Sequence, residues 1–279
     1  MKLALYGLHR GSSADPDTLV RRALLAEDAG FEAIWVGDHI ALPVGEEGDP
    51  ADQPRLEAVV TIAYLAAATS RIGLGFGVLV VPQRQPVLLA KQLATIDHLA
   101  KGRLTIGVGV GYVEPELTAL GASLGDRGAR TDEYLAAMRM LWDEPVPSFT
   151  GEFVSFSEVI QRPRPAQRPH PPIVVGGHSS SAYRRAVQQG NGWYGWDLDV
   201  KDAAGAVTAL RETADRYQRP AELGELEITV TPAGTVDVDT ARRYADAGVH
   251  RLVIQPHTMD GTVIDDLIIT AGDTLVGRI

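Results

Sequence analysis

The sequence predicts one (β/α)8 barrel domain over residues 1–279, with an irregular insertion before its fifth strand. Short apolar segments alternate with segments of helical periodicity, eight of each, an order typical of a parallel barrel. The chain also has about the length, roughly 250 residues, that such a barrel needs. The alternative is a doubly wound open sheet, which normally has a G-x-G-x-x-G turn after its first strand. The corresponding turn here, GLHRGSS, does not match that pattern.

The predicted strands are short and apolar, and each is followed by a helical segment. They cover residues 2–6, 33–36, 72–81, 104–110, 173–175, 192–194, 227–231 and 251–254. The helices are predicted near residues 16–30, 56–69, 86–101, 132–142, 180–189, 203–217, 240–247 and 263–275. Asp15 before Pro16 is typical of an N-cap and a first helical turn, and Gly102 ends the third helix. The Pro-rich run at 162–172 is the irregular segment.

Composition and charge exclude several classes of function. The formal net charge is −10, so no general attraction for nucleic acid or for an anionic membrane is expected. The absence of cysteine excludes disulfides, thiolate metal sites and a cysteine nucleophile. No run approaches the roughly 18 apolar residues of a membrane span, and the apolar start of the chain is shorter than a secretory signal. A cytoplasmic protein is therefore expected.

Asp38 and His39 stand side by side, directly after the second predicted strand. In a (β/α)8 barrel the ligand site is built by the loops at the carboxyl ends of the strands. A carboxylate next to an imidazole at that end is therefore a candidate catalytic pair. The alternative is that Asp38 only caps the loop and that His39 is an ordinary surface histidine.

Glycine alternates with larger residues along the third and fourth predicted strands. Alternate residues of a strand point to the same face, so one face of each strand would carry no side chains. We expect a flat ligand to lie across this bare backbone, and the alternative is tight packing inside a tapering barrel. The glycines concerned are Gly73, Gly75 and Gly77 in one strand and Gly107, Gly109 and Gly111 in the next.

The loop after the fifth predicted strand lies in the run VVGGHSSSAYRRA, residues 174–186. Backbone N–H groups at a helix start, with serine hydroxyls beside them, form a pocket suited to a phosphate. The candidate phosphate-binding residues are Gly176, Gly177, His178 and Ser179. The alternative is an ordinary serine N-cap.

Residues that other chemistries require are absent from the upper ends of the predicted strands. The only lysines are Lys2, Lys91, Lys101 and Lys201, and none follows a strand, so Schiff-base chemistry lacks its nucleophile. The histidines show no pair at metal-ligand spacing and no G-x-S-x-G motif occurs, so neither a metal site nor a serine hydrolase is expected. Redox chemistry on a bound organic cofactor is the activity that this pattern favours.

Blocks of the sequence resemble the bacterial luciferase-like family, and most closely its deazaflavin (coenzyme F420) dependent oxidoreductases. The blocks are WVGDHIALP, LGFGVLVVPQRQPVLLAKQLATIDHLAKGRLTIGVGVGY, and PPIVVGGHSSSAYRRA followed by GNGW. The resemblance runs from the first strand to about Trp193. It implies a barrel that binds FMN or F420 at its upper face, with a non-prolyl cis peptide between Gly77 and Val78 supporting the ring system.

The resemblance also implies roles for individual residues. It places the cofactor phosphate on the loop after the fifth strand, and it places Asp38 and His39 near the reacting face of the ring. Tyr112 stands where several F420-dependent relatives carry a glutamate proton donor. Because tyrosine is a far weaker acid and imidazole groups titrate near neutrality, His39 is the expected donor, with Glu114 in reserve. Arg84 is expected to help hold an anionic cofactor tail, or alternatively to have a surface role.

The functional hypothesis is hydride transfer between F420 and a small organic substrate, with His39 exchanging the accompanying proton. Asp38 would orient His39 or hydrogen-bond the ring, and Tyr112 would shape the substrate side. An FMN-dependent monooxygenase and a non-catalytic flavin-binding protein are the alternatives. A homodimer through the Ala-rich helix at 58–69 is also expected, the alternative being burial of that helix against its own barrel. The substrate stays open, because it depends on the shapes of the surrounding loops.

Overall fold

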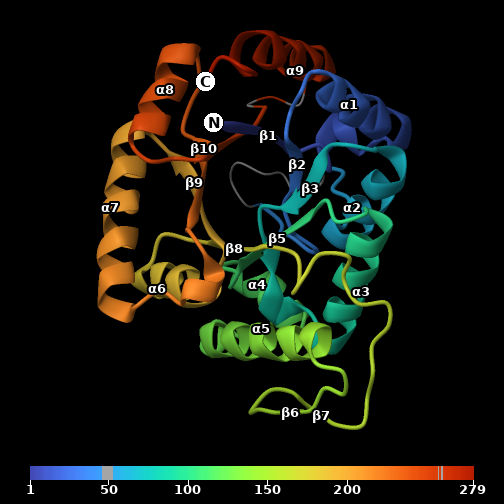
Figure 1. Ribbon diagram of the computed structural model, residues 1–279. Helices are drawn as coiled ribbons and strands as arrows, with labels where there is room; N and C mark the ends of the chain where they lie inside the picture. Colours follow the sequence, from blue (N-terminus) through green and yellow to red (C-terminus); the bar gives the residue numbers. More distant parts are fainter. Residues whose placement is uncertain (46–52, 257, 259) are drawn as a thin grey trace.

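The computed structural model, which describes residues 1–45, 53–256, 258 and 260–279, is a closed barrel of parallel strands surrounded by helices (Figure 1). The hydrogen-bonded order is β3-β2-β1-β11-β10-β9-β8-β5-β4, and pairing of β3 with β5 closes the ring. The (β/α)8 prediction is therefore confirmed. The barrel strands are β1 (Lys2–Tyr6), β2 (Ala33–Val36), β3 (Gly73–Phe76), β4 (Leu79–Val80), β5 (Leu104–Gly109), β8 (Ile173–Gly176), β9 (Gly192–Leu198), β10 (Glu227–Pro232) and β11 (Arg251–Ile254).

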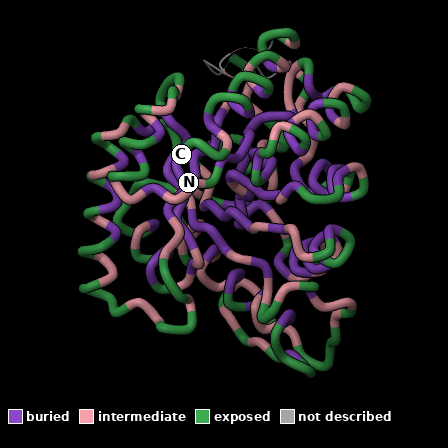
Figure 2. Tube along the Cα trace, turned by 45° about the horizontal axis from the view of Figure 1, so that its top comes forward, coloured by how far each residue is buried: buried purple, intermediate pink, exposed green. Residues whose placement is uncertain are grey.

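Helices cover the outside of the barrel. They are α1 (Pro16–Asp28), α2 (Ala58–Ala68), α3 (Pro86–Leu99), α4 (Glu114–Ala119), α5 (Arg127–Asp143), α6 (Ser180–Gln189), α7 (Val200–Tyr217), α8 (Val238–Asp246) and α9 (Gly261–Leu275). Asp15 caps α1 as predicted, since its side chain accepts from the Thr18 N–H at 2.9 Å. Buried residues concentrate in the strands, and the outer helix surfaces are exposed (Figure 2). None of the helices in the described part of the chain is both long and apolar enough to cross a membrane.

The third barrel strand is interrupted, unlike the continuous strand predicted over 72–81. The chain leaves β3 at Phe76 and resumes regular pairing only in β4. A non-prolyl cis peptide bond joins Gly77 to Val78 at this break, as the family resemblance implied. β4 then pairs with β5, with Leu79 opposite Val108. The break therefore lies at the carboxyl end of the barrel, beside the candidate site.

Two elements lie where the sequence predicts no regular structure. They are α4 and a hairpin of β6 (Phe149–Thr150) with β7 (Ser155–Phe156), which belongs to the insertion before the fifth barrel strand, β8. α4 has six residues, too few for a hydrophobic period to be recognised. α5 begins at Arg127 rather than near 132, because the polar run RGART hides its first turn.

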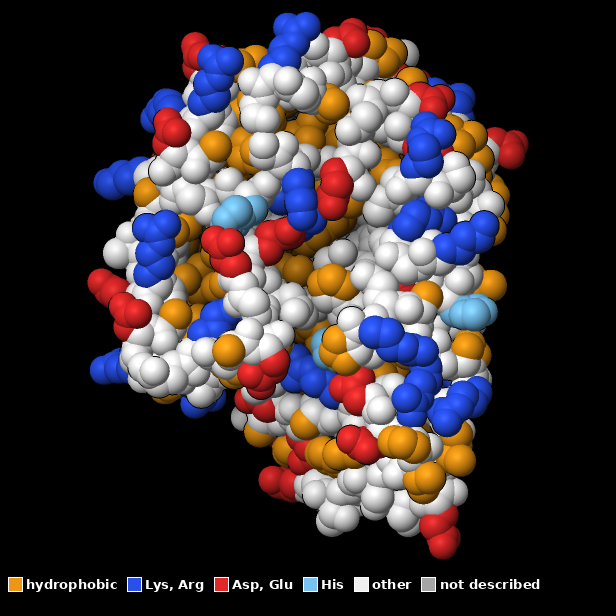
Figure 3. All heavy atoms as spheres, in the orientation of Figure 1, with side chains coloured by type: hydrophobic (Ala, Val, Ile, Leu, Met, Phe, Trp, Pro, Cys, Tyr) orange, Lys and Arg blue, Asp and Glu red, His pale blue; other side chains and the backbone are white. Residues whose placement is uncertain are grey.

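Charged side chains close the amino-terminal end of the barrel. The guanidinium of Arg251 is buried, and its Nε donates to Glu32 Oε2 at 2.9 Å. Arg251 also pairs with Glu227, which Lys2 contacts at 2.6 Å. Basic and acidic side chains are interspersed over the face of the molecule that Figure 3 shows. Ion pairs therefore hold the strand starts together, and the opposite end of the barrel carries the predicted site residues.

Candidate active site

The predicted catalytic residues lie where the neighbouring strands β2, β4 and β5 end. β2 pairs with β3, and β5 pairs with both β3 and β4, so the loops that follow these strands meet at one edge of the barrel mouth. These loops carry Asp38, His39, Arg84 and Tyr112. They also carry α4, whose Glu116 was not among the predicted residues.

His39 and Glu116 form a pair at this edge. The Nδ1 atom of His39 lies 3.0 Å from Oε2 of Glu116. The other carboxylate oxygen of Glu116 accepts from the backbone N–H groups of Ile40 and, at 3.0 Å, of Ala41. Burial would raise the pKa of Glu116, but these hydrogen bonds outweigh burial and hold that pKa below its ordinary value. Glu116 is therefore an ionised acceptor that fixes the orientation of the His39 ring.

This pairing decides which nitrogen of His39 is available to a ligand. An ionised carboxylate at Nδ1 requires that nitrogen to carry the hydrogen, so Nε2 is left for a ligand. The side chain of His39 is 20% exposed and that of Glu116 only 1%, so His39 alone reaches the mouth. The ring of Tyr112 lies edge-on to His39, with centroids 6.1 Å apart. Glu114, the reserve donor, is exposed at the start of α4, and Glu116 takes its place beside the imidazole.

Asp38 has partners different from those expected. Its carboxylate accepts from the Val80 N–H at 2.9 Å and from the Arg84 guanidinium, at 2.6 Å from Nη2 and 3.2 Å from Nε. Arg84 also contacts Glu57 at 2.6 Å. Burial raises the pKa of Asp38, and Arg84 and the Val80 N–H oppose that rise. Asp38 therefore ties the end of β2 to β4 instead of orienting the neighbouring histidine, and Arg84 is engaged by protein carboxylates.

The alternating glycines of the third and fourth predicted strands pack against other residues of the protein. A β-carbon at Gly75 would lie 2.7 Å from Nε1 of Trp35, and one at Gly109 would lie 2.5 Å from a methyl group of Val78. Protein atoms therefore fill the space beside these glycines, in agreement with the alternative of tight packing inside the barrel, and a flat ligand over this backbone stays a prediction. Because glycine has no side chain, these positions leave room for the Trp35 indole in the barrel interior. An added β-carbon would also meet protein atoms at the four other glycines: Glu32 at Gly73, Trp35 and Tyr194 at Gly77, Phe76 at Gly107, and Val80 at Gly111.

The loop between β8 and α6 is exposed and is built for a close approach to the backbone. Gly177 has a φ of +118°, which favours glycine. Ser179 accepts from the Ala182 N–H at 3.2 Å and is therefore the N-cap of α6, as the alternative reading had it. His178 is held by its Nε2, which accepts from the Trp196 N–H at 3.1 Å. The other N–H groups of the first turn have no intrahelical acceptor, so the cap and a bound phosphate are compatible.

A histidine in the turn after β1 escaped the sequence-based prediction. The His9 side chain is fully buried, and within the described residues neither ring nitrogen has a hydrogen-bond partner. Burial, together with the charges of Arg55 and Arg10, holds the pKa of His9 well below its ordinary value. Its Nε2 lies 3.6 Å from the place of a β-carbon on Gly37, just before Asp38. The available signal was its position in GLHRG, at the carboxyl end of a barrel strand.

The arrangement as a whole suits proton transfer. An imidazole that is oriented by a buried carboxylate can give or take a proton at Nε2. Within the described residues no group of three or more His, Asp or Glu side chains is placed to hold a metal ion. What the site can do therefore depends on the molecule that lies beside His39.

Comparison with known proteins identifies the family. The family described as luciferase-like monooxygenase matches residues 3–266. The chain belongs to the luciferase-like monooxygenase family. This confirms the resemblance seen in the sequence, and the chain is accordingly an enzyme of the oxidoreductase class, as its relatives named as monooxygenases are.

The proteins that this chain resembles are named for more than one cofactor. An uncharacterised protein of Mycobacterium tuberculosis strain H37Rv is 32% identical over 258 residues, which cover 88% of this chain and 89% of that protein. The FMNH2-dependent dimethylsulfone monooxygenase of Pseudomonas putida is 33% identical over 196 residues, 69% of this chain and 52% of that protein. An F420-dependent secondary alcohol dehydrogenase, solved with an F420-acetone adduct, superposes with a TM-score of 0.82 at 15% identity over 98% of both chains. At that identity the likeness to the dehydrogenase shows the fold alone.

Proposed function

We propose that this luciferase-like protein is an F420-dependent oxidoreductase that transfers a hydride between F420 and a small organic substrate. The observation that carries the proposal is the pair of His39 and Glu116 at the barrel mouth. Hydride transfer to or from a substrate is accompanied by the exchange of a proton, and an oriented imidazole supplies that exchange. The fold shared with an F420-dependent alcohol dehydrogenase supports the choice of cofactor.

The residues around the mouth fit a flavin-type cofactor. Val78, at the break between β3 and β4, is partly exposed, and its methyl groups fill the space over Gly109 and Gly176. Its apolar side chain thus forms a raised floor on which a flat ring can rest. The exposed loop before α6 supplies backbone N–H groups for the cofactor phosphate.

The residues of the chain then have distinct tasks. Bound F420 would supply a centre that accepts or gives a hydride. Glu116 holds Nδ1 of His39, so that Nε2 gives a proton to the substrate or takes one from it. Asp38 fixes the backbone at Val80, next to the floor of the ring site. Tyr112, edge-on to the imidazole, borders the substrate side.

An FMN-dependent monooxygenase is the second candidate function. The 33% identity with an FMNH2-dependent monooxygenase favours it. In such an enzyme the reduced flavin reacts with oxygen, which a 5-deazaflavin does poorly. A non-catalytic flavin-binding role has no specific observation in its favour.

Parallel titration of the purified apoprotein with F420 and with FMN tests the cofactor assignment. We expect the fluorescence of F420 to change on binding and FMN to bind at least about tenfold more weakly, a difference of roughly 1.4 kcal/mol. Fluorescence at fixed protein concentration measures both dissociation constants. Tight binding of FMN with no response to F420 would overturn the cofactor choice and favour the monooxygenase.

We also propose a homodimer through the outer face of α2. Val60 and Tyr64 on this helix are 67% and 46% exposed, and Leu88 of the neighbouring α3 is 58% exposed. These apolar side chains form a surface that a second copy can bury. A single monomeric species in sedimentation velocity at micromolar concentration would remove this proposal. A cytoplasmic location, and the lack of nucleic-acid or membrane partners, stay predictions.

A further inference from the structure

Trp196 presents an aromatic surface at the mouth of the barrel. Its ring lies 5.0 Å from that of Tyr6 and 6.3 Å from that of Tyr194, centroid to centroid, so it belongs to the aromatic cluster inside the barrel. β9 pairs with β8 only as far as Tyr194, so Trp196 stands beyond the end of that pairing. Trp196 is 37% exposed, whereas Tyr6 and Tyr194 are 6% and 3% exposed. Of these three rings, the indole is therefore the one that a ligand in the mouth can reach.

Trp196 and His39 belong to opposite sides of the mouth. Around the closed barrel, the path from β2 to β9 crosses β1, β11 and β10 in one direction and β3, β5 and β8 in the other, so the two strands are equally far apart both ways. His39 follows β2, and Trp196 lies near the carboxyl end of β9. A molecule in the mouth that exchanges a proton with Nε2 of His39 therefore has the indole on its other side.

A second exposed ring lies beside the imidazole. Tyr112 follows β5, is 74% exposed, and stands edge-on to His39 with ring centroids 6.1 Å apart. Glu116 fixes the loop that carries the imidazole, because it accepts from the backbone N–H groups of Ile40 and Ala41 as well as facing Nδ1 of His39. The nitrogen that exchanges the proton is thus held with one aromatic side chain beside it and another across the mouth.

We propose that the substrate carries an aromatic ring next to its reacting carbon, as an aryl carbinol or an aryl ketone does, and that Trp196 and Tyr112 bind this ring. Aromatic rings in edge-to-face or offset contact attract one another beyond what the burial of their area provides. The inference rests on the F420-dependent function and names its substrate class.

The reacting oxygen of such a substrate faces Nε2 of His39. In the direction of oxidation, the carbinol O–H gives its proton to Nε2, and the electron pair left on the oxygen forms the C=O π bond. The C–H bond breaks, and its electron pair leaves with the hydrogen as a hydride that oxidised F420 accepts. Reduction of the ketone by reduced F420 reverses each of these changes.

Two ketones of nearly the same shape test the preference for an aromatic ring. Acetophenone and cyclohexyl methyl ketone differ in whether the six-membered ring is aromatic. Saturation-transfer NMR on the protein loaded with oxidised F420 measures both dissociation constants without turnover, and steady-state kinetics with reduced F420 measures kcat/KM. We expect acetophenone to bind about three- to tenfold more tightly than its saturated counterpart. Equal binding of the two ketones, or tighter binding of the saturated one, overturns the proposal.

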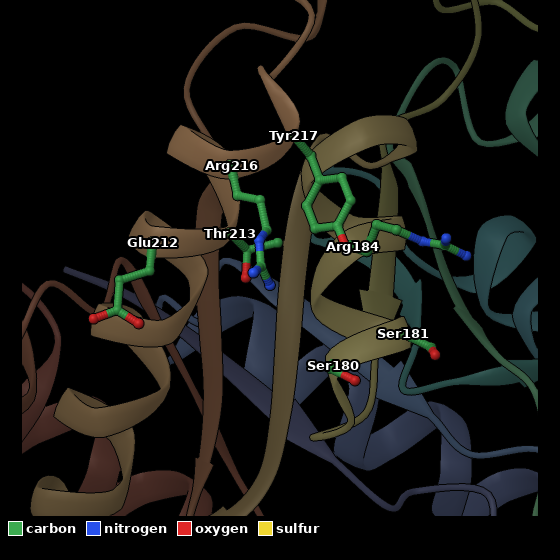
Figure 4. A pocket seen from close by; sticks show the side chains of 7 residues that line it. All are labelled: Ser180, Ser181, Arg184, Glu212, Thr213, Arg216 and Tyr217. Carbon is green, nitrogen blue, oxygen red and sulfur yellow. The ribbon is translucent and has the colours of Figure 1, made fainter.

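Substitutions at the two rings assign the preference to them. Trp196→Leu and Tyr112→Leu should each weaken the binding of acetophenone by about threefold and leave that of cyclohexyl methyl ketone within about twofold. Trp196→Phe and Tyr112→Phe keep a ring and should keep the preference, which guards against a defect in folding. Tyr217→Leu is the matched control and should change neither constant, because Tyr217 is 39% exposed in a groove between α6 and α7, in the helical layer outside the strands (Figure 4). A preference that survives both leucine variants overturns the assignment.

The outcomes separate this inference from the function on which it rests. If the protein turns over ketones with reduced F420 and shows no preference for acetophenone, the substrate class fails and the F420-dependent function stands. If the protein binds FMN in place of F420, and the FMN-loaded protein still prefers acetophenone, the F420-dependent function fails and the binding site for the aromatic ring stands.

Discussion

Alanine in place of His39 should lower turnover by roughly 100- to 10,000-fold, the range that a positioned general acid or base contributes. The variant loses the only nitrogen that the Glu116 contact leaves open to the substrate. The affinity for the cofactor should stay within about threefold of wild type, because ring and phosphate are held elsewhere. Steady-state kinetics and a fluorescence titration of the same preparation measure the two quantities. Wild-type turnover in this variant would remove His39 from the mechanism.

Two further variants test how His39 is oriented. Glu116→Gln keeps the shape of the side chain but removes the charge that fixes the ring, so it should lower kcat less than His39→Ala and alter its dependence on pH. His98→Ala is the matched control, because His98 is an exposed histidine in the last turn of α3 and should not affect turnover. A Glu116→Gln variant with an unchanged pH profile would count against the orienting role.

The fold could be predicted from the sequence because its signals are local. Each barrel strand is a short apolar run, and its helix carries its own period and caps, as Asp15 does for α1. The break after Phe76 could not be predicted from residue patterns, because the run that contains it is apolar throughout. Only the family resemblance indicated the cis bond there.

The site could be predicted only in part, because its contacts join residues far apart in the chain. The position of His39 after a predicted strand indicated that it belongs to the site. Its partner Glu116 could not be predicted, because it lies in a six-residue helix that the sequence pattern does not reveal. The partner of Asp38 is Arg84, 46 positions later. Sequence patterns report which residues share a face or an end, and pairing between distant loops requires the folded structure.

The glycine rows show the same limit for packing. Alternation correctly indicates that these glycines share a face of the strand, but it does not say what fills the space beside them. The register of the sheet shows what fills that space, because it places Trp35 of β2 opposite Gly75 of β3. A large side chain on one strand thus requires glycine on the next, and the sequence of either strand alone cannot distinguish this from a ligand.

Methionine in place of Arg84 should destabilise the fold by roughly 3–5 kcal/mol, the cost of breaking a buried ion pair. The side chain of Asp38 is 1% exposed and that of Arg84 12%, so the variant leaves a buried carboxylate with the Val80 N–H as its remaining donor. Equilibrium unfolding in urea measures the loss. Arg242→Met is the matched control, because Arg242 is exposed and its pair with the exposed Asp239 should contribute no more than about 0.5 kcal/mol.

The destabilisation should depend on pH with a defined sign. Burial raises the pKa of Asp38, and in the variant Arg84 no longer opposes that rise. A carboxyl group whose pKa is higher in the folded state than in the unfolded state binds its proton first in the folded state as the pH falls. The penalty is therefore fully present at neutral pH and shrinks toward about pH 4, near the ordinary pKa of aspartate. The gap in free energy of unfolding between wild type and variant should narrow over that range.

The same variants separate the two roles that Arg84 could have. If Arg84 serves Asp38, then Asp38→Asn and Arg84→Met both break one pair, and the double variant loses less stability than the sum of the two single losses. If Arg84 holds the cofactor tail, Arg84→Met weakens the binding of F420 and leaves the unfolding free energy unchanged. Additive losses in the double variant, together with a fall in cofactor affinity, would return Arg84 to the cofactor site.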